Sequence, residues 1–364
     1  MEKLRVGVIF GGQSGEHEVS LMSATSIINV MDKSKYDIIP IGITKDGRWH
    51  LFLGDVSKIK DGSWIEEAVP VFLPPDPTFK CAISLKDGVE TRYYLDVIFP
   101  VLHGPRGEDG TVQGLFELMN IPYVSCGVGS SAVCMDKVFS KKLLKQEGLP
   151  VVDFKVFYKK DLPQGLSDMV IEVEKSFGYP CFVKPANLGS SVGVSKAHNR
   201  EELKSAIMLA AEFDRKILVE RFIPAREIEC SVLGNDNPVA SLPGEIIPSE
   251  EFYSYTAKYF DGGKSKLLIP APLSAEETEK IRNLAIRAYK ALDCSGMARV
   301  DFLISKVTGV IYINELNSIP GFTSISMYPK MWEASGLSYK ELIDRLIELA
   351  IERHRQKQAL KLTL

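Results

Sequence analysis

The sequence predicts an α/β and α+β protein, in which a doubly wound parallel sheet is followed by two α+β units. Apolar, β-branched strands alternate with helical segments over residues 1–125, as in doubly wound sheets. Glycine-rich loops directly follow several of the apolar strands. Strands and helices then mix without regular alternation over residues 126–223 and 224–364. We therefore expect three domains with these boundaries.

The first domain opens with a strand, a helix and a second strand. Leu4–Phe10 is an apolar run that ends in Gly-Gly, Val19–Val30 has helical character, and Asp37–Ile43 is apolar and β-branched. Such runs are typical of strands buried on both faces. We expect residues 44–93 to be an irregular elaboration. The domain should end with a strand at Tyr94–Leu102, a helix at Thr111–Met119 and a short strand at Ile121–Ser125.

The other two domains contain helices and strands in mixed order. In the second domain we expect helices at Asp136–Glu147, Ile171–Ser176 and Glu201–Glu212, and strands at Val151–Tyr158, Tyr179–Lys184 and Ile217–Glu220. In the third we expect strands at Glu227–Leu233, Ala298–Ile304 and Val310–Glu315, and helices at Ala275–Leu292 and Leu337–Arg353. The last helix is amphipathic, with leucines on one side and acidic residues on the other.

Composition excludes several classes of function. The 364 residues include 44 Lys and Arg against 47 Asp and Glu, so the net charge is −3. Such a balance argues against nucleic acid as the main partner, and no apolar window is long enough to cross a membrane. The six cysteines are scattered without C-x-x-C spacing, which disfavours a zinc site or a disulfide framework. We expect a cytoplasmic protein with reduced thiols.

Residues 298–317 (ARVDFLISKVTGVIYINELN) form the most informative segment. Two β-branched runs flank Ser305–Gly309, a loop of hairpin length. If Ile304 pairs with Val310, Arg299 lies opposite Glu315 and Asp301 lies opposite Ile313.

Four polar side chains of this hairpin should then share one face, because side chains alternate along a strand. They are Arg299, Asp301, Glu315 and Asn317. Carboxylate and amide oxygens suit Mg²⁺, which is usually shared with substrate phosphates. The alternative is an exposed hairpin in which Arg299 and Glu315 form a surface ion pair. The long apolar runs around both carboxylates favour the metal site.

A second candidate site is FVKPANLGSSVG, residues 182–193. Lys184 ends an apolar strand, and the following loop contains Gly189, Ser190, Ser191 and Gly193. Backbone N–H groups and hydroxyls of such a loop can cover a polyphosphate. The spacing differs from that of a Walker A loop. The alternative is a plain β-turn.

Three further loops lie at strand ends. The first is GGQSGEHEVS, residues 11–20, which lacks the dinucleotide fingerprint, so a nicotinamide site is disfavoured. Within this loop, Glu16 could receive a ligand ammonium group or merely complement the helix dipole. His103 in HGPRGEDG lies opposite this loop, although a lone histidine is more often structural. Gly321 and the hydroxyls after it could bind an oxyanion or a carboxylate, beside their role in a Pro-Gly turn.

Taken together, these motifs closely resemble those of the D-alanine–D-alanine ligases of the ATP-grasp superfamily. The match runs in order over nearly the whole chain and comprises GGQSGEHEVS, HGPRGEDGTVQG, MDK, FVKPANLGSSVGVSK, ILVERFI, AKY, ARVDF and NELNSIPGFTSIS. The resemblance implies an ATP-grasp fold of three domains around one cleft: a substrate-binding domain, a central lid domain and a C-terminal catalytic domain. ATP would lie between the last two.

The resemblance also assigns the nucleotide and metal sites residue by residue. Lys137 and Lys184 match lysines that contact ATP phosphates, with Ser190 and Ser191 in the loop over them. The segment that meets the adenine and ribose matches Glu220, Phe222, Ile223 and Glu227. The ligands of Mg²⁺, for which Mn²⁺ is an alternative, match Asp301, Glu315 and Asn317, with Asn317 also beside the nucleotide.

The substrate and catalytic residues follow in the same way. Glu16 matches the acid that receives the first D-alanine's ammonium group, and His103 lies near that substrate's carboxylate. Arg299 and Gly321 match the pair that stabilises the oxyanion. Ser190 and Tyr259 match the network that joins Glu16 to the mobile loop at about 252–266, and Lys258 lies on that loop. Ser326 and Met327 match the positions that hold the second substrate's carboxylate.

The implied activity is the joining of two D-alanine molecules with ATP, through a D-alanyl phosphate, for a peptidoglycan precursor. A tyrosine at position 259 accompanies dipeptide formation in this family. The alternatives are a ligase that joins D-alanine to D-lactate or D-serine, and a catalytically silent nucleotide-binding module. Family resemblance also suggests a homodimer.

Overall fold

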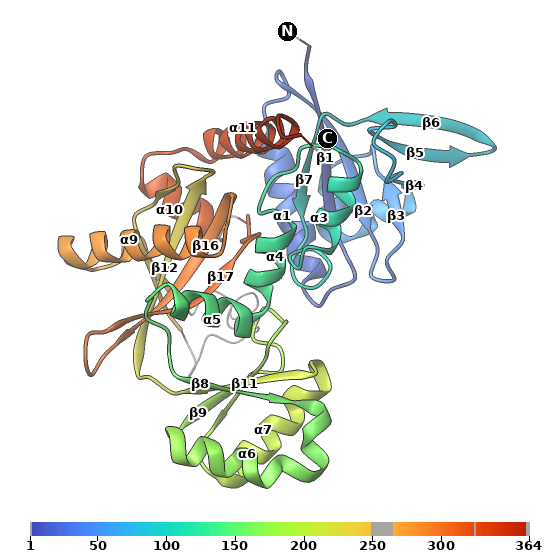
Figure 1. Ribbon diagram of the computed structural model, residues 1–364. Helices are drawn as coiled ribbons and strands as arrows, with labels where there is room; N and C mark the ends of the chain where they lie inside the picture. Colours follow the sequence, from blue (N-terminus) through green and yellow to red (C-terminus); the bar gives the residue numbers. More distant parts are fainter. Residues whose placement is uncertain (1, 249–264, 324, 362–364) are drawn as a thin grey trace.

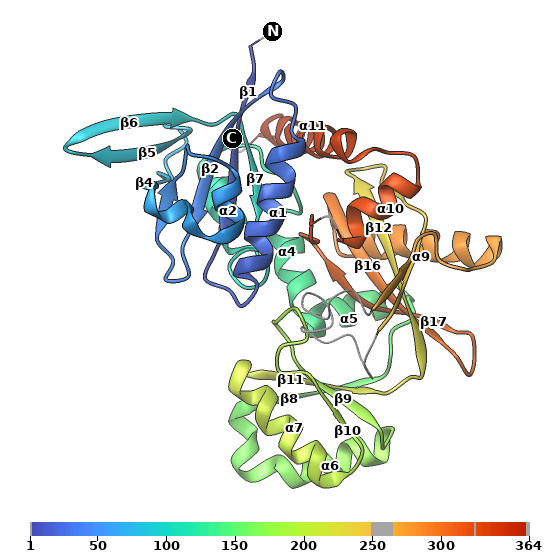
Figure 2. The ribbon, with the colours of Figure 1, turned by 180° about the vertical axis from the view of Figure 1, so that it is seen from behind.

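The computed structural model describes residues 2–248, 265–323 and 325–361. Three sheets dominate this part of the chain, and helices pack against each of them (Figure 1). The central sheet lies apart from the other two, which meet along helix α11, Tyr339–Gln358 (Figures 1 and 2). No helix among the described residues is long and apolar enough to span a membrane.

The N-terminal sheet has the strand order β6-β5-β4-β3-β2-β1-β7. Its parallel part consists of β1 (Leu4–Gly11) between β2 (Tyr36–Ile43) and β7 (Val97–Val101), as predicted. Helices lie on both faces: α1 (His17–Val30) packs on the side of Val6 and Val8, and α3 (Thr111–Leu118) on the side of Ile9. The doubly wound arrangement is therefore confirmed.

The expectation of an irregular segment at residues 44–93 is wrong. It forms four strands that extend the sheet in antiparallel fashion, namely β3 (Trp49–Leu51), β4 (Val69–Phe72), β5 (Cys81–Lys86) and β6 (Val89–Tyr94), together with helix α2 (Ser57–Asp61) and a 3-10 turn at Ser63–Glu66. The sheet is thus mixed. Several of these strands are short and half-exposed, so they lack the apolar runs that mark buried strands. The strand expected at Ile121–Ser125 is reduced to one bridge between Ile98 and Tyr123.

The central sheet has the antiparallel order β10-β9-β11-β8. Its strands are β8 (Phe154–Tyr158), β9 (Cys181–Pro185), β10 (Ser195–Ala197) and β11 (Lys216–Arg221). One face packs on α6 (Leu162–Ser176) and α7 (Arg200–Phe213), and the opposite face carries Lys184 and Glu220. Helix α6 begins nine residues earlier than predicted because Pro163 suits a first helical turn.

The segment before this sheet contains α4 (Val128–Met135), which was not predicted, and α5 (Lys137–Gln146). Helix α5 follows the prediction closely, and the Asp136 carboxylate caps it by accepting from the N–H groups of Val138 and Phe139. A 3-10 turn at Lys159–Asp161 leads into α6.

The C-terminal sheet has the antiparallel order β15-β14-β12-β16-β17, with β13 pairing to β12. Its strands are β12 (Ala225–Gly234), β13 (Val239–Ala240), β14 (Gly244–Ile247), β15 (Lys266–Leu268), β16 (Gly296–Ser305) and β17 (Ile311–Asn317). Helix α9 (Ala275–Ala291) covers one face through a buried apolar core. The short helix α10 (Met327–Ala334) was not predicted.

The predicted register of the β16–β17 hairpin is wrong, although its functional consequence holds. Ile304 pairs with Ile311 rather than with Val310, and a bulge at Asn314 shifts the register once more. Arg299 therefore lies opposite Asn317, and Asp301 lies opposite Glu315.

These two shifts of one residue restore the parity that a single shift would break. Without the bulge, Glu315 would point to the same side as Ile313, which is fully buried in the core under α9. The bulge turns Leu316 into that core instead and leaves Glu315 on the face of Asp301.

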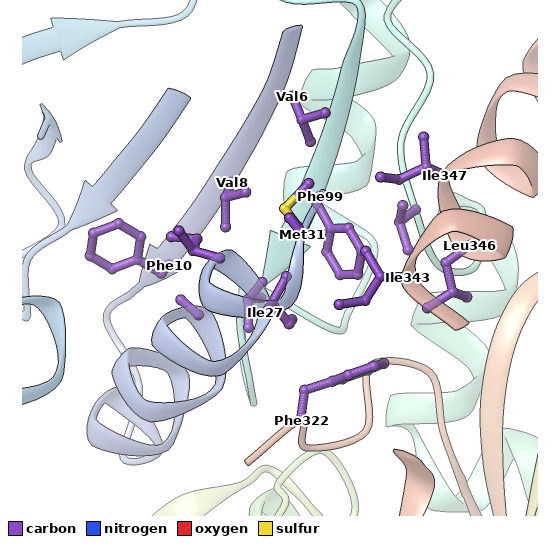
Figure 3. Close-up of a cluster of buried hydrophobic side chains, with 14 of the residues drawn as sticks. Val6, Val8, Phe10, Ile27, Met31, Phe99, Phe322, Ile343, Leu346 and Ile347 are labelled. Carbon is purple, nitrogen blue, oxygen red and sulfur yellow. The ribbon is translucent and has the colours of Figure 1, made fainter. Parts of the chain in front are cut away.

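A single apolar core joins the N-terminal sheet to the C-terminal one. Figure 3 shows Val6, Val8 and Phe99 of the first sheet facing Ile343 and Leu346 of α11, with Phe322 below them. Phe322 follows β17 and is 1% exposed. Its ring centroid lies 5.5 Å from that of Tyr328 and 6.3 Å from that of Phe99. Burial of this ring fixes residues 319–322 against the loops of the N-terminal sheet.

Replacement of Phe322 by alanine should therefore loosen the contact between the two sheets. We expect Phe322→Ala to lower the free energy of unfolding by about 3–5 kcal/mol, because it leaves a cavity in a closed core. Leu53→Ala, at a side chain that is 62% exposed, should change it by no more than about 0.5 kcal/mol. Urea unfolding checks both, and an equal effect of the two variants would contradict the shared core.

Candidate active site

A cavity of about 340 Å³ lies between the central and C-terminal sheets. Its walls come from β9, β11 and the loop after β9 on one side, and from β12, β16 and β17 on the other. The predicted residues that line it are Lys137, Lys184, Ser190, Ser191, Glu220, Phe222, Ile223, Glu227, Asp301 and Glu315. The structure therefore brings together residues that are up to 178 positions apart, from Lys137 to Glu315.

Two lysines hold Glu220 at the end of β11. Lys184 Nζ lies 2.6 Å from Glu220 Oε2, and Lys141 Nζ lies 2.6 Å from Oε1. Burial alone would raise the pKa of the Glu220 carboxyl, but the two ammonium groups outweigh burial and lower it to about 2. Burial alone would lower the pKa of the Lys184 ammonium group. The carboxylates of Glu220 and Glu315 outweigh burial and raise this pKa. Burial lowers the pKa of Lys141, and the nearby Glu220 carboxylate opposes that effect.

Lys137 lies at the start of α5, where it faces the same cavity. Its Nζ atom is 3.4 Å from Glu315 Oε2 and donates a hydrogen bond of 2.6 Å to the Leu188 carbonyl oxygen. Its backbone N–H donates to Ala186. Lys137 therefore connects the glycine loop after β9 with the carboxylate on β17.

The glycine loop at residues 187–193 reaches the N-terminal sheet through Ser190. The Ser190 hydroxyl donates to Glu16 Oε1. Ser190 and Ser191 adopt φ of 51° and 59°, the left-handed region in which successive N–H groups can face one ligand. A Cβ atom on Gly189 would lie 2.9 Å from Glu16 Oε2, so a larger residue there would displace the Glu16 carboxylate.

Arg299 on β16 is enclosed by carboxylates. Its guanidinium donates two hydrogen bonds of 2.7 Å to the two oxygens of Asp301, and its Nε lies 3.0 Å from Glu229 Oε2. Burial would lower the pKa of Arg299, but Asp301 and Glu229 raise it well above its usual value. Arg299 thus pairs with Asp301 and Glu229 and lies opposite Asn317, which does not support the alternative of an exposed hairpin with a surface ion pair between Arg299 and Glu315.

Asp301, Glu315 and Asn317 offer a donor set that fits a magnesium ion. Asp301 and Glu315 are directly opposed across β16 and β17 and line the cavity. The Asn317 side-chain amide donates 3.0 Å to Asp301 Oδ2, which brings Asn317 into the same group. Two carboxylates and an amide oxygen are a donor set that suits Mg²⁺, with water as a further ligand. Among the described residues, no group of three or more His, Cys, Asp or Glu forms a metal cluster.

His103 and Glu108 lie in the loop after β7. The His103 ring nitrogens are 3.2 Å from Ser23 Oγ and 3.1 Å from the Ile319 carbonyl oxygen, and burial lowers the pKa of the ring. Glu108 accepts from the N–H groups of Gly104 (2.7 Å) and Ile319 (3.2 Å). Burial and the nearby Glu16 raise the pKa of Glu108 to about 8. His103 thus packs between two elements, which supports the structural interpretation of a lone histidine.

The segment after β17 folds back on itself at Ser326. The Thr323 N–H donates 3.0 Å to Ser326 Oγ, and a Cβ atom on Gly321 would lie 2.9 Å from the same oxygen. Ser326 precedes α10, which begins at Met327. Gly321, Ser326 and Met327 therefore form one compact turn, whose N–H groups at a helix start can receive an anion.

Some predicted residues lie outside the cavity or outside the described chain. Glu16 reaches the cavity through Ser190, while Arg299 and Asn317 reach it through Asp301. Lys258 and Tyr259, with most of the loop expected at about 252–266, fall outside the described residues.

Three charged residues of this region were not predicted, namely Glu108, Lys141 and Glu229. Strand alternation from Glu227 would have indicated Glu229, and the helical spacing of four from Lys137 would have indicated Lys141. Glu108 lay inside a loop that had already been singled out.

Comparisons with known proteins agree with this geometry. Two family models match the chain: the D-ala D-ala ligase N-terminus over residues 5–126 and the D-ala D-ala ligase C-terminus over residues 143–348. A D-alanine–D-alanine ligase of Thermoanaerobacter sp. (strain X514) is 61% identical over 98% of this chain and 99% of its own length. That of Caldicellulosiruptor bescii is 56% identical over 99% of each chain.

Solved structures lead to the same family. The D-alanine–D-alanine ligase of Coxiella burnetii has a TM-score of 0.86 and 42% identity over 98% of this chain and 97% of its own. A D-Ala:D-Ser ligase of Enterococcus faecalis has a TM-score of 0.87 and 40% identity over 96% of this chain and 100% of its own. The three sheets and the cavity between the central and C-terminal sheets agree with these similarities. The chain belongs to the D-alanine–D-alanine ligase family, which has the ATP-grasp fold and uses ATP.

Proposed function

We propose that this protein is an ATP-dependent D-alanine–D-alanine ligase that makes the dipeptide of a peptidoglycan precursor. One observation carries the proposal. Glu16 of the N-terminal loop and the glycine loop beside Lys184 are joined directly through Ser190. An amino acid whose ammonium group is held by Glu16 would therefore present its carboxylate next to the phosphate end of a nucleotide in the cavity.

The proposed chemistry begins with activation of that carboxylate, which is a poor electrophile. Transfer of the γ-phosphoryl group to the first D-alanine gives an acyl phosphate with a good leaving group. This step depends on positioning and charge neutralisation, for which Lys137, Lys184 and Arg299 supply cationic groups at the cavity. Asp301, Glu315 and Asn317 would hold Mg²⁺, with Mn²⁺ as an alternative, and the ion would neutralise phosphate charge.

The second D-alanine then attacks the acyl carbon through its deprotonated amine, and the peptide bond forms as the C–O bond to phosphate breaks and phosphate leaves. Arg299 and the Gly321 N–H would stabilise the oxyanion that forms, and Ser326 with the Met327 N–H would receive the attacking molecule's carboxylate. The adenine and ribose would contact Glu220, Phe222, Ile223 and Glu227, which also line the cavity. We also propose that the enzyme works in the cytoplasm and as a homodimer, as the family resemblance implies.

The experiment that tests this function is ADP release from Mg-ATP with D-alanine, compared with L-alanine and with no amino acid. We expect release only with D-alanine and a D-alanyl-D-alanine product in the mass spectrum. D-Lactate and D-serine as competing acceptors separate the related ligases. If ATP binds and no D-alanine-dependent ADP appears, the silent nucleotide-binding module is the better interpretation.

Arg299→Lys tests the proposed role in stabilising the oxyanion. Lysine keeps the positive charge between Asp301 and Glu229 but loses the planar pair of donors. We expect kcat to fall by about 10²–10³, with ADP affinity close to that of the wild type. Steady-state kinetics and calorimetry measure both quantities.

Arg226→Lys is the matched control. Arg226, on the neighbouring strand β12, makes the same two-pronged contact with Glu245, at 2.8 and 2.7 Å. Glu245 does not line the cavity, whereas Asp301 and Glu229, the partners of Arg299, do. Its replacement should leave kcat nearly unchanged. A similar loss of kcat in both variants would show that Arg299 acts only on stability.

Glu108→Gln tests the raised pKa of the buried carboxyl. Because the folded state holds this proton up to a pH of about 8, against 4.5 for the free side chain, the native chain binds more protons than the unfolded chain in that interval. Stability should therefore fall as the pH rises through it. The neutral variant lacks this loss, so its melting temperature should rise relative to the wild type between about pH 5 and pH 9. If the difference in melting temperature between variant and wild type stays constant over this pH interval, Glu108 is not a buried, protonated carboxyl.

A further inference from the structure

Lys141 is a buried cation that the proposed chemistry does not use. It lies on α5 one helical turn after Lys137 and is 1% exposed. Its Nζ atom is 2.6 Å from Glu220 Oε1 and donates 2.9 Å to the carbonyl oxygen of Asn314. A lysine so deeply buried is retained in proteins only when its charge is paired.

The two partners of Lys141 belong to different sheets. Glu220 ends β11 of the central sheet, whereas Asn314 is the bulged residue of β17 in the C-terminal sheet. A bulge leaves the extra residue outside the regular ladder of hydrogen bonds, and Lys141 gives its carbonyl a donor. One ammonium group thus connects the wall of the cavity that carries Glu220 to the bulge that turns Glu315 toward the cavity.

The two lysines on Glu220 differ in their access to the cavity. Lys184 lines it and its side chain is 15% exposed, whereas Lys141 does not line it. A phosphate group in the cavity could therefore attract Lys184 but not Lys141. A buried carboxylate that loses its only cation is strongly destabilised. If Lys184 moves from Glu220 to a phosphate group, Glu220 therefore needs a second cation that remains beside it.

We propose that Lys141 is a positioning residue for nucleotide binding: it is the permanent counter-ion of Glu220, and it thereby frees Lys184 to interact with the phosphate groups. This inference rests on the proposed function, because it requires a nucleotide in the cavity. Lys141 has no role in the reaction as proposed above, so the inference adds a residue to it. Glu220 remains ionised in every step, since Lys141 alone keeps it paired.

The test compares Lys141→Met with Lys142→Met in the full-length protein. Methionine has a similar length without the charge, and Lys142 is an exposed neighbour on the same helix. Calorimetric titration measures the affinities for ADP with Mg²⁺ and for adenosine. We expect Lys141→Met to weaken ADP binding by about tenfold or more, because Glu220 then retains Lys184, and to leave adenosine binding nearly unchanged. Lys142→Met should affect neither.

A second background isolates the cause. In Glu220→Gln the carboxylate no longer holds Lys184, so adding Lys141→Met should change ADP affinity by less than about threefold, a non-additive result. If Lys141→Met does not fold, Lys141→Gln, which keeps a donor for Asn314 without the charge, takes its place in both comparisons. The kcat at saturating ATP should change far less than the KM for ATP.

The outcomes separate the inference from the proposed function. Unchanged ADP affinity in the Lys141 variants, or an equal loss for ADP and adenosine, would overturn the positioning role while the ligase assignment stands. An additive effect in the Glu220→Gln background would overturn it as well. A wild-type protein that does not bind ADP would overturn both, because Lys184 would have no phosphate to meet.

Discussion

The structure depends on the pairing of charges that are buried between its sheets. An isolated ion in a protein interior is very costly, and pairing offsets that cost only when each charge keeps a partner at close range. Glu220 has two lysines at 2.6 Å, and Arg299 has Asp301 and Glu229. Lys141 also donates to the Asn314 carbonyl oxygen and so links the central sheet to the C-terminal one, whereas the Arg299 pairs lie within the C-terminal sheet.

The same pairing of charges holds the walls of the cavity. Its carboxylates and cations neutralise one another, so the walls are held by contacts that a nucleotide and a metal ion can later replace. Arg299 covers both oxygens of Asp301, and Lys137 lies beside Glu315. Phosphate and Mg²⁺ carry the same two signs of charge as these partners, which makes an exchange of partners possible without leaving a buried charge alone.

Apolar packing performs the complementary task on the substrate side. The core that contains Phe322, α1 and α11 presses the turn at Gly321 against the loops that follow β1 and β7. His103, Glu108 and Ser23 then complete the contact with hydrogen bonds to residues 319–322. Groups from both ends of the chain thus meet where residues 319–322 contact Ser23 of α1 and the loop after β7.

The sequence alone determined the doubly wound opening and the strand-end loops, because these depend on local patterns: apolar runs and glycines after strands. Alternation along a strand also predicted that Arg299, Asp301, Glu315 and Asn317 share one face, whereas most of the other site residues were implied by the family resemblance. Only the tertiary structure decided which charges meet. The Asn314 bulge depends on packing of Ile313 and Leu316 under α9, and the Lys141–Glu220 and Arg299–Glu229 pairs join residues about 70 to 80 positions apart. Strands β3–β6, several of which are half-exposed, likewise lack the long apolar runs that predict buried strands. Pairing across such distances follows from the way the sheets pack together, which no local pattern encodes.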